Sequence, residues 1–162
     1  MVGRLWIMVC EKIVKVNETL ASEVASVINE ANCMYYRFII PGIHFKYPIV
    51  EVEEIANYMK SMEFFACIVR EEIVGVIALK SSGKEGVVRF LYVKPGFQRK
   101  GIGSELLRFL EDYAKGKGLR KLSLVVHSRA SWAIRLYRSH GFVTIGFRDK
   151  GAWLDYIMMK IL

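Results

Sequence analysis

The stretch Gln98-Arg99-Lys100-Gly101-Ile102-Gly103-Ser104 constrains the fold most, because it stands between a strand pattern and a helix pattern. Residues 87–93 are strongly apolar, as a buried strand is, and residues 102–117 carry apolar side chains at helical spacing. The first turn of a helix leaves backbone N–H groups without partners and carries a partial positive charge. A glycine-rich turn at this point therefore predicts a binding site for a phosphate or pyrophosphate group.

Two well-known glycine motifs bind nucleotide phosphates, and neither fits this turn. A P-loop requires a lysine directly after its last glycine, but Gly103 is followed by Ser104. A dinucleotide fingerprint requires a small residue at the third glycine position, which Leu106 occupies. The turn also follows a run of predicted strands without a preceding βαβ unit. Both nucleotide-binding folds are therefore excluded.

Two motifs of the chain resemble those of the GNAT superfamily of N-acetyltransferases. The acetyl-coenzyme A loop of that family reads Gln/Arg-x-x-Gly-x-Gly/Ala after a strand, and Gln98, Gly101 and Gly103 fill this pattern. Downstream, residues 133–142 resemble the A-x-x-L-Y-x-x-x-G-F element of the same family. The resemblance is clear over residues 74–147 and weaker outside them.

Hydrophobic periodicity predicts a mixed α/β chain in which a meander of strands is followed by alternating helices and strands. The resemblance implies a GNAT-like acyltransferase fold, with a mostly antiparallel central sheet, a parallel splayed pair in its middle and flanking helices. The length suits one domain over residues 1–162. Strands are expected at residues 6–16, 64–69, 73–79, 87–93, 121–126, 142–148 and 153–159, and helices at 20–31, 52–59, 102–117 and 130–140.

The formal net charge of +8 fits a polyanionic ligand such as coenzyme A or a nucleic acid. The basic residues are mostly dispersed, and the sequence has no arginine-rich arm and no recognisable DNA- or RNA-binding motif. We therefore expect a generally basic, solvated surface and no nucleic-acid partner.

Three cysteines, Cys10, Cys33 and Cys67, are widely spaced among apolar neighbours. This odd number favours reduced, buried thiols over a disulfide framework or a zinc site, and we expect no bound metal. The sequence has no apolar stretch of 18 residues, and its first ten residues lack the features of a signal peptide. These patterns predict a cytoplasmic protein that is not in a membrane.

The resemblance implies that acetyl-coenzyme A is the donor and that it binds in the gap between the two splayed strands. Its pantetheine arm would pair with the backbone at the end of one strand, and its pyrophosphate would rest on the amides of the glycine-rich turn. For Gln98 the alternative is a simple surface loop residue. The expected cofactor-binding residues are Leu91, Tyr92, Val93, Gln98, Arg99, Lys100, Gly101, Ile102, Gly103, Ser104 and Tyr137.

Tyr137 matches the tyrosine that members of this family often use as a general acid for the departing thiolate. A free phenol has a pKa of about 10, so its proton is present near pH 7. The alternative is that the ring of Tyr137 only packs beneath the sheet.

The general base is less clearly marked. Some relatives carry a glutamate on the strand before the loop, and residues 88–91 of this chain contain no carboxylate. His127, at the end of the next strand, is the candidate base, acting directly or through water, because its ordinary pKa is near neutral. The alternative is a hydrogen-bonded histidine at a strand end, and His44 is a weaker candidate.

One position departs from the pattern of the family. Many relatives have an asparagine seven residues before the tyrosine, where this chain has Ala130. Contacts from that side chain to the cofactor are therefore expected to be absent unless Ser128 or Ser131 replaces them.

The resemblance thus implies acetyl transfer to a primary amine by direct attack in a ternary complex. The acceptor can be a protein N-terminus, a lysine side chain, a polyamine or another small amine. Selectivity is expected from residues 35–47 and from the turn at 149–153, which could instead form a dimer interface, so the protein is a monomer or a homodimer. The alternatives are a catalytically silent acyl-coenzyme A-binding or interaction module and a basic nucleic-acid binder.

Overall fold

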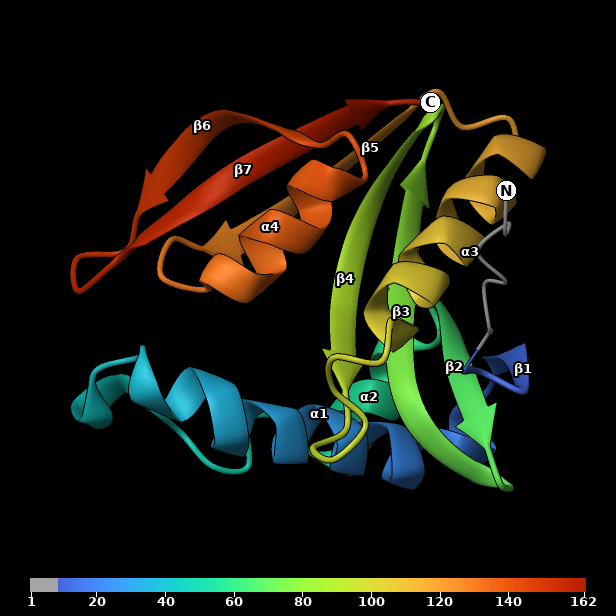
Figure 1. Cartoon of the computed structure of the whole chain (residues 1–162), viewed down its shortest axis with the longest axis horizontal. Coiled ribbons are helices and arrows are strands. Elements are labelled where there is room, and N and C mark those ends of the chain that lie inside the picture. The colour runs from blue at the N-terminus through green and yellow to red at the C-terminus, as the bar shows by residue number, and fades with distance from the viewer. Residues whose placement is uncertain (1–8) are drawn as a thin grey trace, which may run out of the picture.

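A computed structural model describes residues 9–162 as one seven-stranded mixed sheet with helices on both faces (Figure 1). The strand order is β1-β2-β3-β4-β5-β7-β6. The predicted fold class is confirmed, while residues 6–8 of the predicted first strand lie outside the described part. The elements are β1 (Lys12–Val16), α1 (Ala21–Tyr35), α2 (Val52–Tyr58), β2 (Glu63–Val69), β3 (Glu72–Ser82), β4 (Glu85–Val93), α3 (Ile102–Gly116), β5 (Lys121–His127), α4 (Ser131–Ser139), β6 (Val143–Asp149) and β7 (Leu154–Ile161).

The first four strands form the antiparallel meander that the sequence predicts. β1 pairs with β2, β2 with β3 and β3 with β4. The β3–β4 hairpin is longer than predicted, because pairing continues to Ser82 and Glu85 on either side of a short turn. Between α1 and α2 the chain is irregular, as expected, and forms the short 3-10 helices η2 (Tyr36–Phe38) and η3 (Gly42–His44).

Helices cover the two faces of the sheet with separate apolar cores. α3 and α4 pack on one face through residues such as Leu106 and Ile134, and α1 and α2 pack on the other through Ile28 and Ile55. Close packing of α3 requires a glycine on β3, since a Cβ added to Gly75 would lie 2.9 Å from Cγ2 of Ile102.

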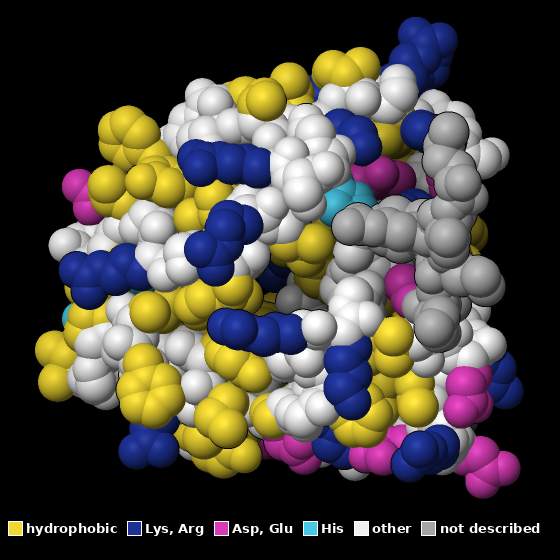
Figure 2. Space-filling view, in the orientation of Figure 1, with side chains coloured by type: hydrophobic (Ala, Val, Ile, Leu, Met, Phe, Trp, Pro, Cys, Tyr) yellow, Lys and Arg dark blue, Asp and Glu magenta, His cyan; other side chains and the backbone are white. Residues whose placement is uncertain are grey.

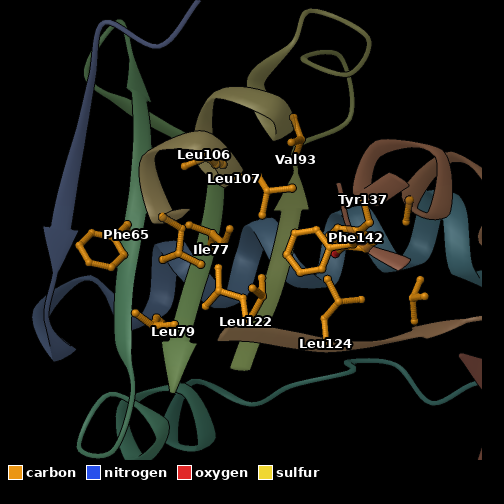
Figure 3. Packing of buried hydrophobic residues seen from close by; sticks show 14 of the residues in the cluster. Phe65, Ile77, Leu79, Val93, Leu106, Leu107, Leu122, Leu124, Tyr137 and Phe142 are labelled. Carbon is orange, nitrogen blue, oxygen red and sulfur yellow. The ribbon is translucent and has the colours of Figure 1, made fainter. Parts of the chain in front are cut away.

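The core beneath α3 and α4 continues to the residue predicted as the general acid. Figure 3 shows the rings of Tyr137 and Phe142 side by side above Leu124, with Leu107 and Val93 next to them. The centroids of the two rings are 5.9 Å apart. The Tyr137 ring therefore belongs to the buried core that joins α4 to the sheet.

The cysteine prediction is wrong for two of the three residues. Cys10 and Cys67 form a disulfide, while Cys33 is free and half-buried. The pair is 57 residues apart in sequence. The two cysteines meet because the chain before β1 continues alongside β2, where Glu11 donates a backbone hydrogen bond to Ile68. Spacing along the chain does not report such a cross-strand neighbour.

Within residues 9–162, no helix has both the length and the apolar character that crossing a membrane requires.

Candidate active site

The site begins where the parallel strands β4 and β5 separate (Figure 1). They pair only from Glu85 to Val87, against Lys121 to Ser123, and then diverge. Among the described residues, no strand therefore pairs with the remainder of β4 on its β5 side. The predicted splay is confirmed, and it leaves backbone hydrogen-bonding groups of β4 facing a gap.

β4 contains a bulge beside this gap, and a bulge changes the direction in which side chains point. Val76 and Ala78 of β3 pair with Tyr92 and Arg89, so the intervening β4 residues oppose a single residue of β3. Phe90 in the bulge has a φ of 53°, which is uncommon for a bulky side chain. Its ring stacks on Phe64, with centroids 5.6 Å apart. Strained backbone of this kind is concentrated at functional sites.

The glycine-rich turn leads directly from β4 into α3. Gly101 is the N-cap residue of α3 with a φ of 86°, and no side chain caps the helix. The amides of the first turn are therefore available to an anion. The Gln98 side chain turns back and donates a 2.8 Å hydrogen bond to the Val93 carbonyl oxygen. Gln98 thus fastens the turn to the end of β4 instead of facing only solvent.

One pocket of about 260 Å³ brings these parts together, between α4, the end of β4 and the glycine-rich turn. Figure 2 shows a hollow on this face with lysine and arginine side chains around it. Every predicted cofactor-binding residue lines the pocket except Lys100, whose Nζ lies 5.5 Å from the centre of the Phe97 ring. The pocket residues are Ala31, Tyr35, Tyr36, Leu91, Tyr92, Val93, Phe97, Gln98, Arg99, Gly101, Ile102, Gly103, Ser104, Trp132, Ala133, Leu136 and Tyr137.

Ala130 is fully buried at the start of α4 and does not line this pocket. Ser128 and Ser131 are not among the described residues that line it either. The aromatic residue Trp132 does line it, and its ring packs against Tyr36 at 5.4 Å between centroids.

A second depression, called here the groove, lies at the splay and has a volume of about 590 Å³. Tyr36, Leu91, Tyr92 and Tyr137 line both the pocket and the groove, so the two cavities meet at these four residues. The groove residues are Asn32, Tyr36, Ile40, Ile49, Val87, Val88, Arg89, Phe90, Leu91, Tyr92, Val125, Val126, His127, Tyr137, Arg148, Lys150, Trp153 and Asp155.

Tyr137 is 8% exposed at this junction. Within residues 9–162 its hydroxyl has no hydrogen-bond partner. Burial, and secondarily the neighbouring Tyr92, raise the pKa of Tyr137 well above its ordinary value. The phenol is therefore protonated throughout the neutral range.

Two further tyrosines stand beside Tyr137. Burial raises the pKa of Tyr92, and burial followed by the nearby Tyr92, Tyr137 and Asp155 raises the pKa of Tyr36. The rings of Tyr36 and Tyr92 meet edge to face at 6.0 Å. The sequence predicts only a backbone contact for Tyr92, and it predicts only a general part in selectivity for residues 35–47, which include Tyr36, because neither tyrosine lies in a motif.

His127 is 7% exposed and lines the groove. Its Nδ1 accepts a 3.0 Å hydrogen bond from the backbone amide of Arg129. Burial lowers the pKa of His127, an effect that Asp155 opposes and Arg129 adds to. The neutral ring therefore carries its hydrogen on Nε2, which is buried and has no partner among the described residues. In this arrangement Nε2–H of His127 can donate a hydrogen bond, whereas the lone pair of Nδ1 already accepts one.

His140 directly follows α4, and its side chain contacts α3. Its Nε2 lies 2.8 Å from Oγ of Ser104, and its Nδ1 lies 3.4 Å from Oε1 of Glu111. Burial would raise the pKa of Glu111, but the nearby His140 and the hydrogen bond from Lys160 Nζ outweigh burial and lower the pKa. The Ser104–His140–Glu111 series thus ties the first turn of α3 to the end of α4.

The comparisons with known proteins agree with this geometry. The family model described as "Acetyltransferase (GNAT) family" matches residues 25–142. A spermidine N(1)-acetyltransferase of Thermoplasma acidophilum is 32% identical over 93 residues, which cover 56% of this chain and 58% of that protein. An S-(2-succino)cysteine N-acetyltransferase of Bacillus subtilis is 32% identical over 114 residues, which cover 63% of this chain and 69% of that protein.

Among solved structures, the PaiA N-acetyltransferase of Thermoplasma acidophilum in complex with coenzyme A has a TM-score of 0.80 and 25% identity. That match covers 93% of this chain and 98% of the other. A probable N-acetyltransferase of Xenopus tropicalis is 33% identical over 93 residues, which cover 56% of this chain and 44% of that protein. The chain thus matches about half the length of the first curated relatives.

Proposed function

Because the chain belongs to the acetyltransferase (GNAT) family, we propose that it transfers an acetyl group from acetyl-coenzyme A to a primary amine. In this proposal the amine attacks the donor directly in a ternary complex, and residues 1–162 form one catalytic domain. The junction between the pocket and the groove carries this proposal. Tyr36, Leu91, Tyr92 and Tyr137 line both cavities, so a donor in the pocket and an acceptor in the groove would meet beside the Tyr137 hydroxyl.

The pocket suits the donor in the charged and hydrogen-bonding groups that it presents. The uncapped amides after Gly101 fit a pyrophosphate, and Arg99 adds a full positive charge at the same rim. The β5 side of Leu91, Tyr92 and Val93 lacks a strand partner, so the amide groups of a pantetheine arm can pair there in the manner of an added strand.

In the transfer, the neutral amine nitrogen attacks the thioester carbonyl carbon. A carbon–nitrogen bond forms, the carbon–sulfur bond breaks, the amine loses one proton, and the departing thiolate gains one. Tyr137 supplies the latter proton, since burial keeps its phenol protonated and its hydroxyl has no competing partner within the described chain.

The proton of the amine leaves through water in the groove, which is open to solvent. Among the described residues that line the groove, Asp155 carries the only carboxylate. For His127 to act as the base at Nδ1, its hydrogen bond with the Arg129 amide would have to break, so we give His127 the role of a hydrogen-bond donor to the acceptor.

The acceptor class is left open by family membership. The names of the relatives cover a polyamine and a cysteine derivative, and another relative is a protein N-alpha-acetyltransferase, RimI of Mycobacterium tuberculosis.

The experiment is incubation of the protein with acetyl-coenzyme A and mixed amines, with detection of acetylated products by mass spectrometry and of coenzyme A release. Release above the level without acceptor is the expected result. A thermal shift with coenzyme A but no acetylated product in any mixture would instead indicate a silent binding module.

A further inference from the structure

The groove contains more positively than negatively charged side chains. Three cations, Arg89, Arg148 and Lys150, line it together with one carboxylate, that of Asp155. Arg89 is half-buried, and its guanidinium carbon lies 5.1 Å from the centre of the Phe90 ring, which holds the charge beside the aromatic wall. The groove therefore carries a positive charge close to the residues shared with the pocket.

No carboxylate of the described residues forms an ion pair with these cations. Within residues 9–162, Arg89, Arg148 and Lys150 form no ion pair, whereas five lysines outside the groove do. The Asp155 carboxylate already accepts a 2.9 Å hydrogen bond from Nε1 of Trp153. Cations left without counter-charges in a concave site attract and orient anionic ligands.

Sheet register brings the polar groups into one row. Arg148 of β6 lies opposite Asp155 of β7, and Asp155 lies opposite His127 of β5. Residues that lie opposite each other on antiparallel strands point to the same face of the sheet. The buried Nε2–H of His127, which has no partner among the described residues, thus lies in the same row as the Arg148 cation.

We propose that the acceptor is a small amine that also carries a carboxylate, as an amino acid does, and that Arg148 and Lys150 bind this carboxylate. The inference rests on the proposed function and specifies its second substrate. The Asp155 carboxylate suits the acceptor amine in its protonated form, which is the form that first enters the groove. The apolar residues Ile40 and Ile49 also line the groove and suit an apolar side chain of the acceptor. A polycation would instead meet three unpaired positive charges.

The test uses matched acceptors that differ only in the group beside the amine. Leucine, methionine and phenylalanine are each compared with the corresponding primary amide and decarboxylated amine, and spermidine is included. The amides are less basic than the free acids, so more of each amide is neutral at a given pH. A preference for the acid over its amide therefore cannot come from amine ionisation.

We expect kcat/KM for at least one free acid to exceed that for its amide and its amine by about tenfold or more, which corresponds to one charge-assisted contact. Equal or better turnover of the amide, the amine or spermidine would overturn the inference and leave the proposed function standing. Absence of acetylation in every arm would overturn the inference alone if the screen of mixed amines gives an acetylated product, and would overturn both if that screen gives none.

Variants then assign the carboxylate contact. Arg148→Gln and Lys150→Gln should each raise KM for the free acid about fivefold or more and leave kinetics with the amide within about twofold. The matched control is Arg120→Gln, an exposed residue next to the closed end of the β4–β5 pair and outside the groove. If both groove variants behave like Arg120→Gln with the free acid, these residues do not bind the carboxylate.

Discussion

The backbone amide of Arg129 donates a 3.0 Å hydrogen bond to Nδ1 of His127. The only other ring nitrogen, Nε2, then carries the hydrogen of the neutral imidazole. Since burial also lowers the pKa of His127, we expect this residue to donate a hydrogen bond near pH 7 and not to accept the proton of the amine.

His127→Asn is therefore expected to raise KM for the acceptor and to lower kcat by less than about tenfold, because general base catalysis by a positioned side chain contributes about 10²–10⁴. The fall in rate at low pH should remain, since it reports protonation of the acceptor amine. Loss of that pH dependence together with a fall of about 10² or more in kcat would return the base role to His127.

We expect the affinity for the cofactor to depend on the backbone conformation of Gly101. Its φ of 86° is strained for any residue with a Cβ, although no atom lies within 4 Å of the place a Cβ would occupy. Gly101→Ala should destabilise the fold by about 1 kcal/mol and weaken coenzyme A binding about tenfold or more, as measured by calorimetry.

Gly118→Ala is the matched control, because Gly118 has a φ of 83°, is equally open and follows the far end of the same helix. It should lose similar stability and keep its affinity for coenzyme A. Equal loss of affinity in both variants would mean that general destabilisation, and not a changed position of the backbone amides at the start of α3, explains the effect.

The hydrogen bond between Ser104 and His140 joins the cofactor turn to the end of α4. Ser104→Ala and His140→Ala should each weaken coenzyme A binding by a few-fold, which is about 1 kcal/mol for a single hydrogen bond. The double variant should lose no more than the weaker-binding single variant, because both changes remove the same contact. If the two losses multiply, the residues act independently. Ser139→Ala, an exposed neighbour, serves as the control.

Glu63 of β2 links its strand to β1 and to α3. It accepts hydrogen bonds from the Tyr113 hydroxyl of α3 and from Nζ of Lys117, the residue that follows α3, both at 2.5 Å, and from Lys15 Nζ of β1 at 3.2 Å. Burial would raise the pKa of Glu63, but these hydrogen bonds outweigh burial and lower the pKa to about 2.

The unfolded-state pKa of a glutamate is about 4.3. The stability that Glu63 contributes is therefore complete above that pH and is lost as the pH falls toward about 2. Glu63→Gln should lower the free energy of unfolding by about 1–2 kcal/mol at pH 7 and by little near pH 2, as measured by urea titration. Glu85→Gln, which removes an exposed pair with Lys121, should cost less than about 0.5 kcal/mol at either pH. Equal effects of the two changes at pH 7 would contradict this role of Glu63.

Local patterns were sufficient to predict the glycine-rich turn, because all of its parts are adjacent in sequence and its chemistry comes from the backbone. Gln98 and Gly101 come from one continuous motif, and Tyr137 comes from a second motif on the next helix. The order of helices and strands along the chain could likewise be predicted from periodicity, and the splay followed from the family resemblance.

The groove could not be predicted in the same way. Arg148, Asp155 and His127 come from three strands and meet only through sheet register. The same limit applies to the Cys10–Cys67 disulfide. The tautomer of His127 depends on a backbone amide two residues away, which no residue pattern reports.

Tyr137 allows a separate prediction about pH. Because burial raises its pKa, kcat should rise as the acceptor amine loses its proton and should not fall again below about pH 10, the ordinary phenol pKa. A descending limb near pH 8 or 9 that Tyr137→Phe abolishes would contradict the raised pKa. The wild-type protein with the best acceptor is the reference.

The most direct measurement is kcat of Tyr137→Phe at saturating acetyl-coenzyme A, beside the dissociation constant for coenzyme A. Phenylalanine keeps the ring against Phe142 and removes only the hydroxyl. The expected result is a fall in kcat of about 10²–10⁴, typical for loss of a general acid, with coenzyme A affinity within about threefold of wild type. An unchanged kcat across the pH range would contradict Tyr137 as the proton donor at the junction of pocket and groove.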